Sequence, residues 1–288
     1  MHQNMYDLTN PQKSIWYTEE FYKGTPINNI SGTVIIPKKV NFKLLKQAIN
    51  IFVEKNDSFR LKFALNGNKV HQFVENYKEF DIETIFLESD KDLKRLEESA
   101  SSLIFNVFNS FLFKFQILKF KDGHGGFIIT MHHLISDAWS AGIGASSIID
   151  IYSRLLNNEN LDSLSYPSYI DYINSEKDYI KSLKYAIDKD FWNKLYEKVP
   201  EIAKIPGTYK NDFENNLSAN RLRYIVPKGI LDKSQDYCKK NNISLFNFFM
   251  ALFAIYIGRV SSLEEFVIGT PILNRSNIKE KHTSRYVY

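Results

Sequence analysis

The stretch "FIITMHHLISDAWS", residues 127–140, decides the fold, because an apolar run ends in two adjacent histidines. The chain has only six histidines, yet His132 and His133 are neighbours, and Asp137 comes four residues after the second. In a strand, neighbouring side chains point to opposite faces, so the two histidines cannot easily perform the same task. One is expected to face an interior and the other a cleft, and the alternation alone does not decide which.

Three interpretations of the histidine pair compete. A metal site needs ligands that converge on one point, and adjacent histidines on opposite faces provide this poorly. A neutral imidazole, with an unperturbed pKa of about 6.5, can instead take a proton from an attacking amine or hydroxyl. A chance pair at the end of a strand is the third interpretation. The pattern disfavours the metal site and leaves the other two open.

The flanking segments predict a hairpin and a helix. Residues 111–120, "FLFKFQILKF", precede the turn "KDGHGG", and the histidine strand returns from it, which predicts an antiparallel pair. Residues 139–158, "WSAGIGASSIIDIYSRLLNN", predict a helix that begins directly after the motif.

The N-terminal part predicts more elements of both kinds. Residues 31–37 predict a strand, and Asn41 is a suitable N-cap for the amphipathic helix that follows. Asn66 and Gly67 separate two apolar runs, and both are expected at the positive-φ positions of a hairpin turn. Residues 91–108 predict a further helix.

The second half is predicted to be mainly helical. Residues 169–195 have apolar positions at helical spacing, and "ISLFNFFMALFAIYIG" has Ser244 as an N-cap and Gly258 as a stop. The latter helix is apolar all round, which predicts that it is buried. Residues 264–271, "EEFVIGTP", predict a short strand. Helices that alternate with hairpins indicate an α+β or layered α/β fold in two lobes.

Composition fits two lobes, which we place at residues 1–178 and 179–288. Hydrophobic residues make up 44% of the 288 residues, enough for a sizeable core. The net charge of +4 comes from 37 basic and 33 acidic side chains spread along the chain. Such a mild and diffuse charge argues against a nucleic-acid partner.

Cysteine content and hydropathy indicate the cellular compartment of the protein. The single cysteine, Cys238, excludes an internal disulfide framework and favours a reducing compartment, and its polar surroundings argue against a nucleophilic role. The N-terminus shows no signal-peptide pattern. The longest apolar run, residues 248–257, is too short to span a bilayer. We therefore expect a cytoplasmic protein without membrane association.

The segment "MHHLISDAWS", residues 131–140, resembles the His-His-x-x-x-Asp-Gly motif of nonribosomal peptide synthetase condensation domains, in the chloramphenicol acetyltransferase-like superfamily. Related acyltransferases and epimerisation domains share this motif. Four further segments resemble condensation-domain motifs and follow the family's order: "TNPQKSIWY" (9–17), "KNDSFRLKF" (55–63), "YPSYIDY" (166–172) and "IGTPILNRSN" (268–277).

The resemblance implies two acyltransferase-like lobes in a V, with a tunnel between them. A donor carrier protein would present an acyl or peptidyl thioester at one mouth, and an acceptor carrier would present an aminoacyl thioester at the other. The acceptor amine would attack the donor thioester and form an amide bond. The phosphopantetheine arms belong to the carriers, so we expect the chain itself to bind no cofactor and no metal.

The resemblance also implies roles for single residues. His133 would orient or deprotonate the amine, whereas His132 and Asp137 would be architectural. A buried carboxylate is costly without a cation, so Asp137 is expected to pair with Arg275, or as a second choice with Arg60. Three residues are expected along the substrate tunnel, with packing in the core as the alternative for the aromatic ones: Trp139, Ser140 and Tyr169.

Three departures from the family pattern affect these expectations. Ala138 replaces the motif glycine, and it is expected to narrow the site if its φ is negative. Asn56 stands where the family's second segment has a histidine. The segment that the family places after "NR" does not appear in residues 278–288, so the second lobe is expected to be incomplete.

An incomplete lobe would expose strand edges and apolar surface, which predicts self-association and poor catalysis by the chain alone. The chain opens almost directly on the first motif, so the donor carrier is expected on another polypeptide. Two other functions stay open: another acyltransferase or an epimerisation domain of the superfamily, or a remnant that only binds a carrier protein.

Overall fold

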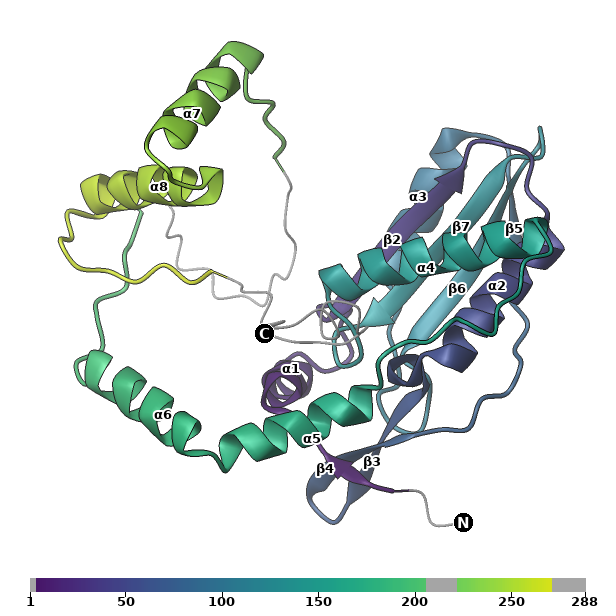
Figure 1. Cartoon of the computed structure of the whole chain (residues 1–288), viewed down its shortest axis with the longest axis horizontal. Coiled ribbons are helices and arrows are strands. Elements are labelled where there is room, and N and C mark those ends of the chain that lie inside the picture. Colours follow the sequence, from purple (N-terminus) through teal and green to yellow (C-terminus); the bar gives the residue numbers. More distant parts are fainter. Residues whose placement is uncertain (1–3, 206–221, 271–288) are drawn as a thin grey trace. The chain divides into compact units, whose positions relative to one another are not determined.

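The computed structural model describes residues 4–205 and 222–270, which fall into two compact units that are described separately (Figure 1). Among the described residues, the first unit ends at Ser182 and the second begins at Leu183. The boundary predicted after residue 178 lies inside the helix α5, Tyr169–Ile180, which the first unit keeps whole.

The first unit is a mixed α+β domain. Its strands are β1 Tyr6–Asp7, β2 Asn29–Ile36, β3 Leu61–Asn66, β4 Lys69–Val74, β5 Glu83–Leu87, β6 Phe113–Phe120 and β7 Gly125–His132. Its other helices are α1 Asn10–Phe21, α2 Phe42–Lys55, the short 3-10 helix η1 Asp57–Arg60, α3 Asp90–Ser101 and α4 Ala138–Leu156.

The larger sheet has the strand order β2-β7-β6-β5, and its strand β7 ends at His132 of the histidine motif. β7 is antiparallel to both of its neighbours, and all eight of its residues are buried. Ile129 and Met131 pack into a core with α2 and α4, whereas Ile128 packs on the other face with α3. The predicted hairpin and the predicted alternation of this strand are therefore confirmed.

The turn before β7 is shorter than predicted, because Gly125 and Gly126 already belong to the strand. A Cβ atom on Gly126 would collide with the carbonyl oxygen of Val34 in β2. Glycine at this position therefore lets the two strands approach closely.

The smaller sheet, β1-β4-β3, contains the other predicted hairpin, but its turn lies one residue later than predicted. Asn66 pairs with Lys69 as the last residue of β3, so Gly67 and Asn68 form the turn. Gly67 has a φ of +61°, and Asn66 has no positive φ. This fits a type II′ turn, in which only the first turn residue needs a positive φ.

Two predicted helices are shorter in the structure. The helix predicted over residues 91–108 ends at Ser101, where the side chain of Asn29 donates hydrogen bonds to the carbonyl oxygens of Ser101 and Leu103. The helix predicted over residues 169–195 is broken after Ile180.

The predicted helix starts are confirmed. The side chain of Asn41 accepts the N–H of Leu44 at the start of α2. The side chain of Ser244 accepts the N–H of Asn247 at the start of α8, Leu245–Ser261.

The second unit, described over residues 183–205 and 222–270, contains α6 Leu183–Leu195, α7 Lys228–Lys240 and α8. The predicted stop at Gly258 is wrong, because α8 continues to Ser261 and ends where Ser262 takes a φ of +56°. Residues 264–270 form no strand, contrary to the prediction, and Pro271 lies outside the described residues.

The predicted burial of α8 is also wrong. Ile257 is its one buried residue, whereas Phe249 and Phe253 are 41% and 47% exposed. The described part of the chain packs α7 against α8 and leaves most large apolar side chains of α8 uncovered.

Candidate active site

The histidine motif lies where β7 ends and α4 begins. His132 is the last residue of β7, and Asp137 is the N-cap of α4. A tight turn joins them, in which the N–H of Ile135 donates to the carbonyl oxygen of His132 over 3.1 Å. A central strand and a packed helix therefore hold both ends of the motif.

His132 is buried, with 3% of its surface exposed, as expected for the inward-facing histidine. Its Nε2 lies 3.1 Å from Oε2 of Glu19, and its Nδ1 accepts the backbone N–H of Leu134 over 3.1 Å. A ring nitrogen that accepts a hydrogen bond carries no hydrogen, so the ring is neutral with its hydrogen on Nε2. His132 thus connects α1 with the turn of the motif.

Glu19 reaches His132 from the buried face of α1. Its Oε2 also accepts a hydrogen bond from the side-chain nitrogen of Asn28 over 2.8 Å. Burial raises the pKa of Glu19, but the hydrogen bonds from His132 and Asn28 outweigh it, so the pKa lies below its usual value. Glu19 is therefore a charged acceptor at neutral pH.

His133 is partly exposed, and its Nδ1 lies 3.2 Å from the carbonyl oxygen of Ser136. A carbonyl oxygen can only accept, so Nδ1 carries the hydrogen and Nε2 is the basic atom of the neutral ring. Burial lowers the pKa of His133 below its usual value, although the Ser136 carbonyl and the charge of Asp137 oppose this shift. The imidazole is therefore unprotonated at neutral pH, as a general base must be.

Asp137 is buried, and its carboxylate caps α4. Its Oδ1 accepts hydrogen bonds from the backbone N–H and the hydroxyl of Ser140, both over 2.7 Å. An N-cap carboxylate satisfies a helix N–H that has no partner within the helix. The preferred ionic partner, Arg275, lies outside the described residues, so that pairing stays a prediction.

The second choice of partner for Asp137 is wrong. The guanidinium of Arg60 donates to the carbonyl oxygens of Val53 and Glu54 at the end of α2, and to that of Glu75 over 3.2 Å. A cation at a helix C-terminus stabilises carbonyl groups that lack helical partners. Arg60 is therefore engaged with the end of α2 and makes no ion pair with Asp137 in the described structure.

Ala138 and Trp139 are the first two residues of α4, and both are exposed. Ala138 is helical and has no positive φ, so the backbone here does not require a glycine. Trp139 is 46% exposed, so the alternative of a place in the core is wrong, and its place along a substrate tunnel stays a prediction.

Ser140 and Tyr169, also predicted along the tunnel, are both buried. The hydroxyl of Ser140 is bound to Asp137, and Tyr169 packs in a core with 1% of its surface exposed. The N–H of Tyr169 donates to the carboxylate of Asp57 over 2.8 Å, and its hydroxyl lies 3.4 Å from Oγ1 of Thr9. Tyr169 therefore connects the first and second motif segments, and the place of Ser140 and Tyr169 along a substrate tunnel stays a prediction.

Two buried polar residues of α1, Gln12 and Glu19, were not predicted from the sequence. The side chain of Gln12 donates to the carbonyl oxygen of Leu134 over 3.0 Å and pairs with Gln72 over 2.8 Å. Gln12 and Glu19 are seven residues apart and so lie on one helix face, two turns from each other. Polar residues on the inward face of an amphipathic helix were the signal that could have revealed them.

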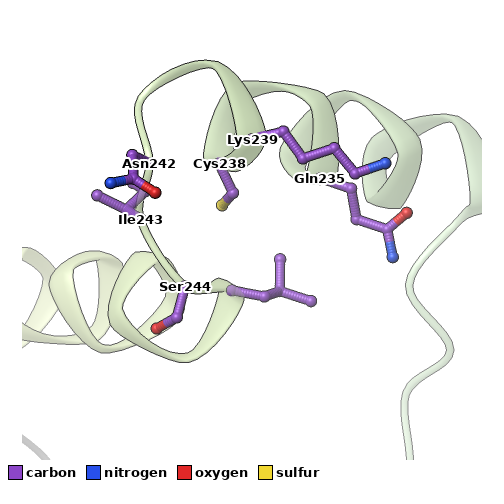
Figure 2. A pocket seen from close by; sticks show the side chains of 7 residues that line it. Gln235, Cys238, Lys239, Asn242, Ile243 and Ser244 are labelled. Carbon is purple, nitrogen blue, oxygen red and sulfur yellow. The ribbon is translucent and has the colours of Figure 1, made fainter.

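Outside the motif, the described residues offer little that suggests a ligand site. They contain no group of three or more His, Cys, Asp or Glu side chains that could hold a metal ion. A hollow of about 690 Å³ lies between α7 and α8 and is lined in part by Cys238, Lys239 and Ser244 (Figure 2).

Length and hydropathy together decide whether a helix could cross a membrane. No single helix among the described residues is long and apolar enough, and one bent pair, α7 with α8, passes by length and composition only.

Comparison with known proteins identifies the family. A family model described as "Condensation domain" matches residues 2–287. Surfactin synthase subunit 1 of Bacillus subtilis is 33% identical over 285 residues, which cover 96% of this chain and 8% of that protein. A plipastatin synthase protein of the same organism is 27% identical, over 98% of this chain and 11% of that protein. The chain thus matches a small part of much longer relatives.

Solved structures confirm the predicted fold class. The condensation domain of monacolin K polyketide synthase superimposes with a TM-score of 0.83 at 14% identity, over 98% of this chain and 66% of that one. A starter condensation domain of rhizomide synthetase, in complex with C8-CoA, gives 0.80 at 18% identity, over 98% and 64% of the two chains. The chain has the mixed helix and sheet fold of these proteins and belongs to the condensation-domain family.

Proposed function

We propose that the chain forms an amide bond between a carrier-bound acyl or peptidyl thioester and the amine of a carrier-bound aminoacyl thioester. The observation that carries this proposal is the neutral imidazole of His133, whose Nε2 is the basic atom and whose ring is partly exposed. Membership of the condensation-domain family supports the reaction class. The phosphopantetheine arms of the carriers supply the thiols, so the chain needs no cofactor of its own.

In the proposed step, the neutral amine attacks the thioester carbonyl carbon, the C–N bond forms and the C–S bond breaks. Nε2 of His133 takes the proton that the amine loses, and the departing sulfur receives a proton, so the products are an amide and a thiol. General-base catalysis contributes about 10²- to 10⁴-fold, and alignment of the two substrates contributes about 7–11 kcal/mol.

The test uses one donor carrier and one acceptor carrier, both loaded, with the product followed by mass spectrometry. We expect slow but detectable amide formation by the wild-type chain and a loss of about 10²- to 10⁴-fold in His133→Ala, without a lower melting temperature. His124→Ala, in the turn before β7, is the matched histidine control and should keep full activity. Wild-type turnover by His133→Ala would refute the general base.

The pH dependence of the reaction provides a second readout. The pKa of His133 lies below the usual value of 6.5, so activity should persist below pH 6.5 and fall only as the ring becomes protonated. A parallel assay with a CoA thioester as donor tests the alternative of a diffusible substrate. If the chain instead inverts the α-carbon of an aminoacyl group on a single carrier, without forming an amide, it is an epimerisation domain.

A further inference from the structure

We propose that Glu19 is a positioning residue for His133, because it holds the peptide groups on both sides of His133 through His132 and Asn28. The meaning of this arrangement for catalysis rests on the proposed role of His133 as the base. The arrangement itself lies within the first unit and can be tested without turnover.

The first connection runs through the ring of His132. Oε2 of Glu19 accepts Nε2–H of His132 over 3.1 Å, which keeps the hydrogen on that nitrogen. Nδ1 is then able to accept the N–H of Leu134, 3.1 Å away. This N–H belongs to the peptide group directly after His133. Glu19 keeps the ring hydrogen of His132 on Nε2 and so leaves Nδ1 able to accept this N–H.

The second connection runs through Asn28. The same Oε2 of Glu19 accepts the side-chain N–H of Asn28 over 2.8 Å. The carbonyl oxygen of Asn28 accepts the backbone N–H of His133 over 2.8 Å, which belongs to the peptide group before the catalytic side chain. One carboxylate oxygen therefore supports both peptide groups from which the His133 side chain projects.

Burial makes this network hard to replace with water. Glu19, Asn28 and His132 are 7%, 4% and 3% exposed, and the ring of Phe105 lies edge-to-face on His132 with centroids 6.2 Å apart. Hydrogen bonds to a charged acceptor are stronger than neutral ones, and a buried donor without an acceptor is destabilising. Loss of the acceptor at Glu19 should therefore loosen the backbone at His133.

The position of His133 should depend on the acceptor oxygen of Glu19 more than on its negative charge, as the surrounding charged groups indicate. Apart from the neutral ring of His132, the ionisable group that acts on Glu19 is Lys23, which makes its ion pair with the exposed Glu20 over 3.5 Å. The groups that act on His133 are His132 and Asp137. A neutral side chain that keeps an oxygen in place should therefore preserve the position of His133.

The experiment measures the ring-nitrogen signals of the histidines by NMR in the 288-residue chain, with His133 assigned by their loss in His133→Ala. Glu19→Gln keeps an acceptor oxygen, Glu19→Asp withdraws it by one methylene, and Glu19→Met has similar length without one. We expect the fraction of His133 with its hydrogen on Nδ1 to be unchanged in Glu19→Gln and lower in Glu19→Asp. It should be lowest in Glu19→Met. Glu20→Met, on the exposed side of the helix, should leave the signals unchanged.

Unchanged His133 signals in both Glu19→Asp and Glu19→Met, with only His132 shifted, would overturn the proposal. If Glu19→Met does not fold, Glu19→Asp decides alone, because its smaller change preserves the carboxylate. Where wild-type turnover is measurable, Glu19→Met should lower kcat on the order of 10- to 100-fold while the acceptor KM stays unchanged. Full turnover by His133→Ala would refute the proposed function and leave the NMR result standing, so the two failures are distinguishable.

Discussion

β7 and α8 are both strongly apolar segments, yet β7 is fully covered and α8 is largely open. All eight residues of β7 are buried, whereas α8 buries Ile257 alone. β7 has a strand on each side and helices on both faces of its sheet, while α8 packs against α7 in the described part of the chain. An apolar composition thus indicates that burial of a segment is favourable, whereas the strands and helices that pack against it determine whether it is buried.

The largest expected effect comes from removing the same side chain in each segment. Ile129 is 2% exposed in β7, and Ile255 is 54% exposed in α8. Ile129→Ala should lower the free energy of unfolding by about 2–5 kcal/mol, since it leaves a cavity in a packed core. Ile255→Ala should change it by about 0.5 kcal/mol or less. Urea denaturation of both variants checks the comparison, and equal losses would show that α8 is covered in solution.

The open surface of α8 should also drive self-association. Its exposed apolar side chains include Phe246, Phe249 and Phe253, whose spacing places them on one face of the helix, and large exposed apolar patches favour association. Light scattering should show oligomers of the wild-type chain and a lower mass for the double variant Phe253→Glu with Ile255→Glu. Phe86→Glu, at an even more exposed apolar side chain in β5, serves as the control and should not change the mass. A monodisperse wild-type monomer would contradict this expectation.

A smaller effect separates two roles of Asp137. As the N-cap of α4, it should contribute about 0.5–2 kcal/mol, whereas one partner of a buried ion pair would contribute about 3–5 kcal/mol. If the cap is the main role of Asp137, Asp137→Ala lowers stability by the smaller amount, and Asp137→Asn, which keeps the cap, nearly restores it. Thermal melting distinguishes the two. A loss above about 3 kcal/mol in both variants would support the predicted pairing with Arg275.

The predictions that the structure confirms rest on local physics, within a strand or at the start of a helix. Alternation along residues 127–132 predicted the two faces of β7, and the caps at Asn41 and Ser244 predicted two helix starts. Predictions failed where distant residues intervene. At the end of α3, the side chain of Asn29 in β2 donates to the carbonyl oxygens of Ser101 and Leu103, more than 70 residues along the chain.

The candidate site divides in the same way. Strand alternation separated the two histidines, and the family resemblance assigned the inward position to His132 and the more exposed position to His133, as the structure has them. Glu19 could not be found in this way, since it lies 113 residues from His132 and meets it only through the packing of α1. The partner of Asp137 was sought among cations, whereas the donors to its carboxylate among the described residues belong to its own helix, at Ser140.

The smallest expected effect concerns Ala138, where the motif of the family has glycine. Ala138 is the first residue of α4, is exposed and has no positive φ, so alanine is unstrained there. Glycine is less favourable than alanine in a helix by about 1 kcal/mol in its interior and by less at its first turn. Ala138→Gly should therefore lower the free energy of unfolding by under about 1 kcal/mol in urea denaturation. If the methyl group narrows the site, the same variant should raise turnover in the carrier assay. A clear gain in stability would instead reveal backbone strain at Ala138, because relief of strain is the physical reason for which glycine would stabilise this position.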